Sequence, residues 1–104
     1  MNFICMVGRV KSLPEVRETP SGNKVATLEV EVERNFPNSE GVFESDVFSA
    51  TLWRGLAESC NDICAVNSIV SLKGRLQARS FETKEGNTFS NNEIIVEKLS
   101  FVGK

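Results

Sequence analysis

The chain has 104 residues, of which 40% are hydrophobic and 25% are charged, and its formal net charge is −2. This length and composition predict one soluble globular domain over residues 1–104, because the chain is too apolar for a disordered protein and too short for two hydrophobic cores. No stretch is long and apolar enough to cross a bilayer, and the first residues lack the pattern of a signal peptide. We therefore expect a cytoplasmic protein without a membrane partner.

The residue types argue against catalysis and metal binding. The sequence has no histidine, which removes the commonest general base and a preferred zinc ligand. Its three cysteines, Cys5, Cys60 and Cys64, form no CxxC pair and indicate reduced thiols of a cytosolic protein. There is no P-loop and no pair of carboxylates flanked by apolar residues. We expect no enzymatic activity, no metal and no cofactor.

Positive and negative charges are concentrated in different parts of the chain. Residues 1–24 and 50–81 each carry a surplus of +2, whereas residues 25–49 carry −5. Because the net charge is negative, any surface that binds phosphate groups has to be local.

Short runs of alternating apolar and polar residues, separated by turn residues, are typical of an all-β domain. They predict five strands over residues 3–11, 24–36, 43–54, 68–80 and 93–102. Glycine, asparagine and proline mark turns at residues 19–23, 37–41 and 84–87.

One segment, residues 55–66, has the periodicity of an amphipathic helix. The residues that recur at three- and four-residue spacing are Leu56, Ser59, Cys60, Ile63 and Cys64. Three strands, one short helix and two further strands match the five-stranded Greek-key β-barrel of the OB fold. The predicted class is therefore an all-β barrel with one short helix.

Side-chain alternation assigns a face to the residues of the second and third strands. The apolar residues expected in the core are Val25, Leu28, Val30, Val32, Phe48, Ala50 and Leu52. The residues expected on the outer face are Glu29, Glu31, Glu33, Ser49, Thr51 and Trp53. Trp53 thus lies on a half-wet surface, where a lid over one end of the barrel and a subunit contact are alternatives to ligand binding.

The fourth predicted strand presents cations on one face. Its core side consists of Val70, Leu72, Gly74, Leu76 and Ala78. Its other side consists of Lys73, Arg75, Gln77, Arg79 and Phe81. A cationic strand face also discourages edge-to-edge aggregation, which is the alternative explanation of this row.

Trp53 and Phe36 favour nucleic-acid binding over that alternative. An exposed tryptophan next to Arg54 suits the stacking of a base, which contributes about 1–3 kcal/mol and tolerates any sequence. Lysine and arginine side chains alongside neutralise phosphates. For Phe36, which precedes Pro37, packing of the loop is the alternative.

Eight short motifs lie in order along the chain. They are VGRV at 7–10, PEVR at 14–17, TPSG at 19–22, VAT at 25–27, RNF at 34–36, LWR at 52–54, LAE at 56–58 and GRLQARSF at 74–81. Together they resemble the bacterial single-stranded DNA-binding protein family over essentially the whole chain.

The resemblance implies an OB-fold core around which single-stranded DNA wraps without strong sequence preference. It implies a homotetramer, with a dimer as the alternative, in which residues 3–7 help to form the subunit interface. The stacking aromatics would be Phe36, Trp53 and Phe81, while a fourth stacking position is occupied by Val47. The phosphate-binding residues would be Arg9, Arg34, Arg54, Lys73, Arg75 and Arg79.

Three features depart from the family pattern. The second strand carries the outward glutamates, and residues 65–67 read Ala-Val-Asn where the family usually has Lys-Lys-Gly. Family members typically continue into a flexible tail with an acidic tip that recruits genome-maintenance proteins, whereas this sequence stops at Lys104. A tail that was removed and a tail that never existed are both open.

We expect a protein of the bacterial nucleoid that protects single-stranded DNA during replication, repair or recombination, with replication or recombination proteins as further partners. The alternative is a primosome-type accessory OB protein that acts mainly in protein assembly. An OB module for structured RNA or oligosaccharide is a third reading.

Overall fold

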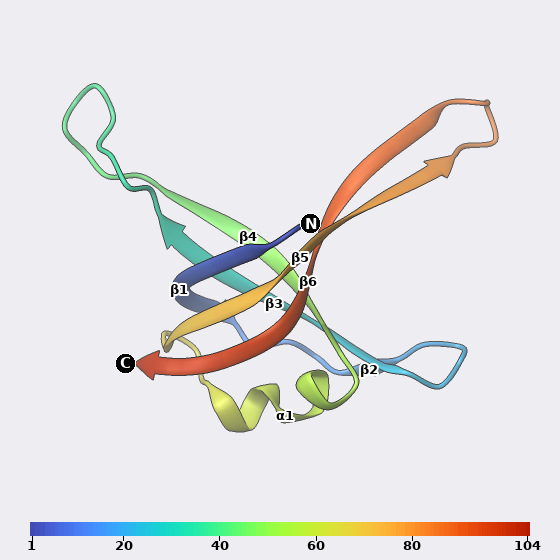
Figure 1. Cartoon of the computed structure of the whole chain (residues 1–104), viewed down its shortest axis with the longest axis horizontal. Coiled ribbons are helices and arrows are strands. Elements are labelled where there is room, and N and C mark those ends of the chain that lie inside the picture. The colour runs from blue at the N-terminus through green and yellow to red at the C-terminus, as the bar shows by residue number, and fades with distance from the viewer.

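The segments in which apolar and polar residues alternate form β-strands along most of the chain. The computed structural model describes residues 1–104 apart from the side chains of Arg79, Phe81 and Phe89. The elements, shown in Figure 1, are β1 (Ile4–Ser12), β2 (Arg17–Glu18), β3 (Lys24–Glu33), β4 (Ser45–Trp53), α1 (Gly55–Ile63), β5 (Ile69–Glu82) and β6 (Thr88–Gly103). The five predicted strands and the helix are present, and β2 is an additional strand of two residues. The predicted all-β class with one short helix is confirmed.

The strands form a single sheet in the order β1-β5-β6-β4-β3-β2, and β1 also pairs with β3. This extra pairing closes the sheet into a ring. The strand pairs are antiparallel except β4 and β6, which run parallel and pair only at Ala50–Ile94 and Thr51–Ile95. Beyond these two pairs β4 and β6 diverge, so each continues into a hairpin that leaves the ring (Figure 1).

Two glycines allow the strands to approach closely enough for closure. A Cβ atom on Gly74 would lie 1.9 Å from the carbonyl oxygen of Ile95, and one on Gly8 would lie 2.7 Å from that of Glu31. Neither distance is compatible with a side chain, because the obstacle is backbone. These positions therefore require glycine where strands cross at close range.

The core fills the ring and extends to α1, which covers its lower end in Figure 1. Its buried members are Val10, Ala26, Leu28, Val30, Ala50, Leu52, Ala57, Cys60, Cys64, Val70, Leu72, Ile94, Val96 and Leu99. Val25, expected in the core, is buried with 6% of its surface exposed, although it lies opposite Trp53 and an odd number of residues from Leu28, outside the main cluster. The helix ends at Ile63, earlier than predicted, since Cys64 has extended backbone.

The three cysteines are free thiols, two of which belong to this core. Burial, together with the neighbouring Cys64, raises the pKa of Cys60 to about 12. Cys5 is exposed on β1.

The hairpin of β5 and β6 corrects a second expectation. Leu76 and Ala78 were predicted to face the core, but both are exposed, Leu76 by 40%. The two strands are 14 and 16 residues long and continue beyond the ring as an arm (Figure 1), where the described side chains leave Leu76 and Ala78 exposed. The side chain of Asn2 completes the edge of this arm, donating to the carbonyl of Leu76 and accepting from its amide at 2.9 Å.

The helix has nine residues. Within the described part of the chain, no helix has the length and apolar character of a membrane span.

Candidate nucleic-acid interface

The outer face of the ladder between β3 and β4 carries both the predicted stacking tryptophan and the acidic row. Opposite residues of an antiparallel pair share a face, and the outward pairs are Val25–Trp53, Thr27–Thr51, Glu29–Ser49, Glu31–Val47 and Glu33–Ser45. One end of this face is therefore aromatic and hydroxylic, and the other end is acidic. The two ends are roughly 27 Å apart, at about 3.4 Å per residue.

Trp53 lies in an open groove of about 370 Å³. The groove is lined by Arg17, Glu18, Thr19, Pro20, Val25, Thr27, Thr51, Trp53 and Glu93. β2 and the turn after it supply one wall, and Glu93 of β6 supplies another. The hydroxyl of Thr51 donates to Oε1 of Glu93 at 2.8 Å, which fixes the polar part of the lining. The half-buried indole thus lies between ordered walls of the groove and retains accessible surface.

One arginine lines this groove, and a second follows Trp53 in sequence. Arg54 follows Trp53 directly, is exposed and has a positive φ of 57°, while its amide donates to the carbonyl of Lys24 at 2.8 Å. Arg17 lines the groove from β2. Sequence reasoning missed Arg17 as a site residue because a two-residue strand has no alternation; its place just ahead of the turn at 19–23 was the available signal.

The cations of β5 share the outer face of the ring with this groove. Arg75 is opposite Ile95 of β6, and Ile95 is opposite Thr51 of the groove. Nη1 of Arg75 lies 3.3 Å from Oε2 of Glu97, an exposed ion pair. Nζ of Lys73 lies 5.2 Å from the centroid of the Phe3 ring, in cation–π geometry.

Two of the predicted residues lie outside the described side chains. The backbone places Arg79 opposite Asn91 and Phe81 opposite Phe89 on the arm. Their contribution stays a prediction.

Arg9 lies away from Trp53. It pairs in register with Glu31 of β3, within the acidic part of the ladder, and its Nη1 donates to the carbonyl of Asn67 at 2.7 Å. The structure therefore does not group Arg9 with the groove.

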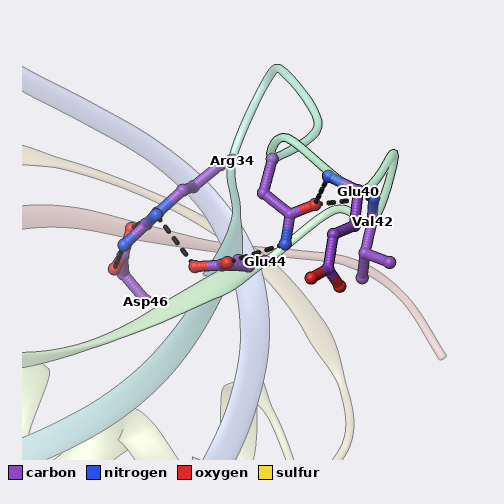
Figure 2. Close-up of polar contacts among 6 residues, drawn as sticks. Arg34, Glu40, Val42, Glu44 and Asp46 are labelled. Carbon is purple, nitrogen blue, oxygen red and sulfur yellow. Dashed lines mark hydrogen bonds and ion pairs between the residues drawn. The ribbon is translucent and has the colours of Figure 1, made fainter.

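Arg34 and Phe36 occupy the loop that joins β3 to β4, at the acidic end. Figure 2 shows the Arg34 guanidinium between two carboxylates. Its Nε and Nη2 donate to Asp46 at 3.0 and 2.9 Å, and its Nη1 donates to Glu44 at 3.0 Å. The hydrogen bond from Arg34 lowers the pKa of Asp46. Phe36 is 68% exposed on the same loop.

The structure thus divides the predicted site into separate groups. Trp53 and Arg54 lie together, with Lys73 and Arg75 on the same outer surface. Arg34 and Phe36 lie at the far end of the ladder. The missing stacking position, Val47, is 53% exposed between them. Among the described residues no group of three acidic or cysteine side chains is placed to hold a metal ion.

Comparison with known proteins agrees with this architecture. The model of the single-strand binding protein family matches residues 1–102. Single-stranded DNA-binding protein B of Bacillus subtilis is 36% identical over 101 residues, covering 97% of this chain and 89% of the relative. Single-stranded DNA-binding protein 1 of Staphylococcus aureus is 34% identical over 102 residues, covering 98% and 61%.

Single-stranded DNA-binding protein 3 of Listeria innocua is 35% identical over 102 residues and is covered for 64% of its length. The chain therefore spans less than two thirds of the length of the Staphylococcus and Listeria relatives. The closed sheet, with its helix between β4 and β5, is the OB fold of this group. On the match over nearly its full length, the chain belongs to the single-strand binding protein family.

Proposed function

We propose that the chain binds single-stranded DNA without strong sequence preference, with a base stacked on Trp53 and phosphates held by neighbouring cations. The observation that carries this proposal is the half-buried indole in an open groove of about 370 Å³. The relatives quoted above are named for binding single-stranded DNA, which supports it. The family name likewise describes binding rather than catalysis.

A groove of this kind suits an unpaired strand. The flat ring of a base packs on the indole whatever its identity, because every base has a π-face, whereas a duplex keeps its bases stacked on one another. The exposed hydroxyl of Thr27 offers hydrogen bonds that do not discriminate strongly between bases, whereas that of Thr51 is buried and donates to Glu93. Arg17 lines the groove and Arg54 follows Trp53 in sequence, while Lys73 and the ion-paired Arg75 lie on the outer face toward β5, where the sugar–phosphate backbone would run.

Further stacking positions extend the site along longer strands. Phe36 is exposed on the loop beyond the far end of the ladder, so it would engage only a DNA strand long enough to reach past both ends. Val47 offers apolar contact between them. Phe81 would act from the arm.

The biological setting is part of the proposal. We expect protection of single strands in replication, repair or recombination in the bacterial nucleoid. Phe3, which precedes β1, and Val7 of β1 are 60% and 55% exposed, which supports contact between copies in a homotetramer or a dimer. Light scattering with and without a long oligonucleotide measures that state.

The direct test uses the natural fluorophore, since Trp53 is the sole tryptophan. Titration with a thymidine oligonucleotide at low salt is expected to quench its fluorescence, because stacking brings the base onto the indole. The affinity is expected to fall with salt, with a slope of about −0.7 per phosphate contact for a single strand. Absence of both quenching and binding at low salt would contradict the proposal.

A second candidate is an accessory OB protein that acts mainly in protein assembly. The observation that favours it is the acidic row of Glu29, Glu31 and Glu33, which lies in three of the five outward pairs of the β3–β4 ladder and repels phosphates. Weak DNA binding that is unchanged by Trp53→Ala would favour this candidate over the first.

A further inference from the structure

The loop between β3 and β4 is held by an internal polar network. The side chain of Asn38 accepts from the amides of Glu40 and Val42 at 2.9 and 3.0 Å, and its Nδ2 donates to Oε1 of Glu44 at 2.9 Å. Figure 2 shows how these contacts lead from the loop to Arg34. The amide of Arg34 also donates to the carbonyl of Glu44 at 2.9 Å. Glu44 is therefore positioned from two sides.

Glu44 of the loop and Asp46 of β4 together fix the guanidinium of Arg34. Asp46 takes two of its N–H groups in a bidentate pair and Glu44 takes a third, all at 2.9–3.0 Å. An isolated exposed ion pair contributes little, but bidentate geometry within a network is the case in which such pairs are ordered. Three of the five donors of Arg34 are thus in use.

We infer that Glu44 and Asp46 occupy the phosphate-binding edge of Arg34. These two carboxylates thereby lower the affinity of the β3–β4 loop for single-stranded DNA. The inference rests on the proposed function. A carboxylate and a phosphate present their oxygens to the guanidinium fork in the same bidentate way, so they compete for one edge. The cluster of one arginine and two carboxylates also has a net charge of −1, which repels a phosphate.

The acidic row adds to this effect at the same end of the ladder. Glu33 is opposite Ser45 on the outer face, next to Asp46 in sequence. By alternation, Asp46, which is opposite Val32, lies on the other face of the ladder from Glu33, so the two acidic groups meet only at the end of the ladder. Asp46 and Glu44 thus lower the affinity for DNA. Arg34 contacts a phosphate only when these carboxylates release it.

The test removes the two carboxylates without changing side-chain shape. A chain carrying Asp46→Asn and Glu44→Gln is expected to bind a long labelled thymidine oligonucleotide more tightly. Its salt slope is expected to steepen by about 0.7, because Arg34 gains a phosphate. The control is Glu40→Gln, which removes one charge from the same loop at a side chain for which Figure 2 draws no contact to Arg34. It is expected to leave the slope unchanged.

A second variant separates release of Arg34 from a simple change in net charge. Adding Arg34→Gln to the double variant is expected to abolish the steeper slope. The inference is overturned if the double variant gains nothing, if the gain persists without Arg34, or if Glu40→Gln gives the same slope change.

Quenching of Trp53 by a short oligonucleotide shows that each variant is folded and binding-competent. If DNA quenches Trp53 fluorescence in the native chain but the double variant shows no gain in affinity or salt slope, the inference is overturned and the proposed function stands. Native chain that shows no binding at low salt overturns the proposed function and the inference with it.

Discussion

The two ends of the β3–β4 ladder carry the same kinds of residue and differ in what those residues touch. Each end has an aromatic ring and an arginine: Trp53 with Arg54 at one end, Phe36 with Arg34 at the other. Trp53 is half-buried in a groove, and no ion pair involves Arg54 among the described side chains. Phe36 projects from a loop with 68% of its surface exposed, and two carboxylates hold Arg34.

The difference teaches that residue type alone does not define a contact for DNA. An aromatic ring contributes most when its position is fixed before the base arrives, because the cost of ordering it has already been met by folding. An arginine contributes most when its donors are not already satisfied. By both criteria the Trp53 end is the primary site, and the Arg34 end is secondary.

The largest expected effect is that of Trp53→Ala on affinity. Loss of the stacking surface should weaken binding by about 1–3 kcal/mol, or roughly 5- to 150-fold. The salt slope should stay the same, because stacking is not electrostatic. Anisotropy of a labelled oligonucleotide measures both quantities, and Trp53→Phe serves as the control that retains a ring. An equal loss from Phe36→Ala would break the distinction between the two ends.

Removal of a cation near the groove should have the next largest effect. Arg54→Gln and Lys73→Gln are each expected to flatten the salt slope by about 0.7, since each removes one phosphate contact. Lys11→Gln is a control of equal charge, because Lys11 pairs with Glu31 at 3.3 Å on the acidic part of the ladder. Equal slopes for the three variants would mean that net charge, and not position, governs binding.

Arg34→Gln in the native chain should leave the slope nearly unchanged. Its guanidinium is already bound to Glu44 and Asp46, so no phosphate contact is lost. The comparison with Arg54→Gln under identical conditions sharpens the contrast between the ends. A fall of about 0.7 for Arg34→Gln would show that Arg34 holds a phosphate in the native complex.

The smallest effect concerns pH. Arg34 holds the pKa of Asp46 below its ordinary value of 3.8, and such a group stabilises the folded loop above 3.8 and loses that contribution as pH falls through the lowered value. The carboxylate therefore stays charged at pH 5, and the salt slope should be the same at pH 5 and pH 7. A steeper slope at pH 5 would indicate early release of Arg34.

Much of the fold could be predicted because the alternation of side chains is local. The five main strands, the helix and the outward position of Trp53 all follow from the period of two or of 3.6 residues. β2 was not predicted, because two residues are too few to show an alternating pattern. Leu76 and Ala78 were misplaced because alternation tells which residues share a face but not whether another layer covers that face.

The site was harder to predict than the fold. Arg34, Glu44 and Asp46 were all visible in the sequence, but alternation does not show which charged side chains meet across a hairpin. The register of β3 and β4 and the turn around Asn38 decide that pairing. Arg17 reaches the groove through the path of a loop, which also depends on the assembled structure.

The most direct test is photo-crosslinking with a bromodeoxyuridine oligonucleotide of about five residues, which is near the lower limit for one OB fold. Peptide mapping of the product identifies the side chain on which the base stacks. We expect the adduct at Trp53, with none at Phe36, because so short a strand binds at the primary end. Adducts at Phe36 in place of Trp53 would contradict the assignment of the groove as the primary DNA site.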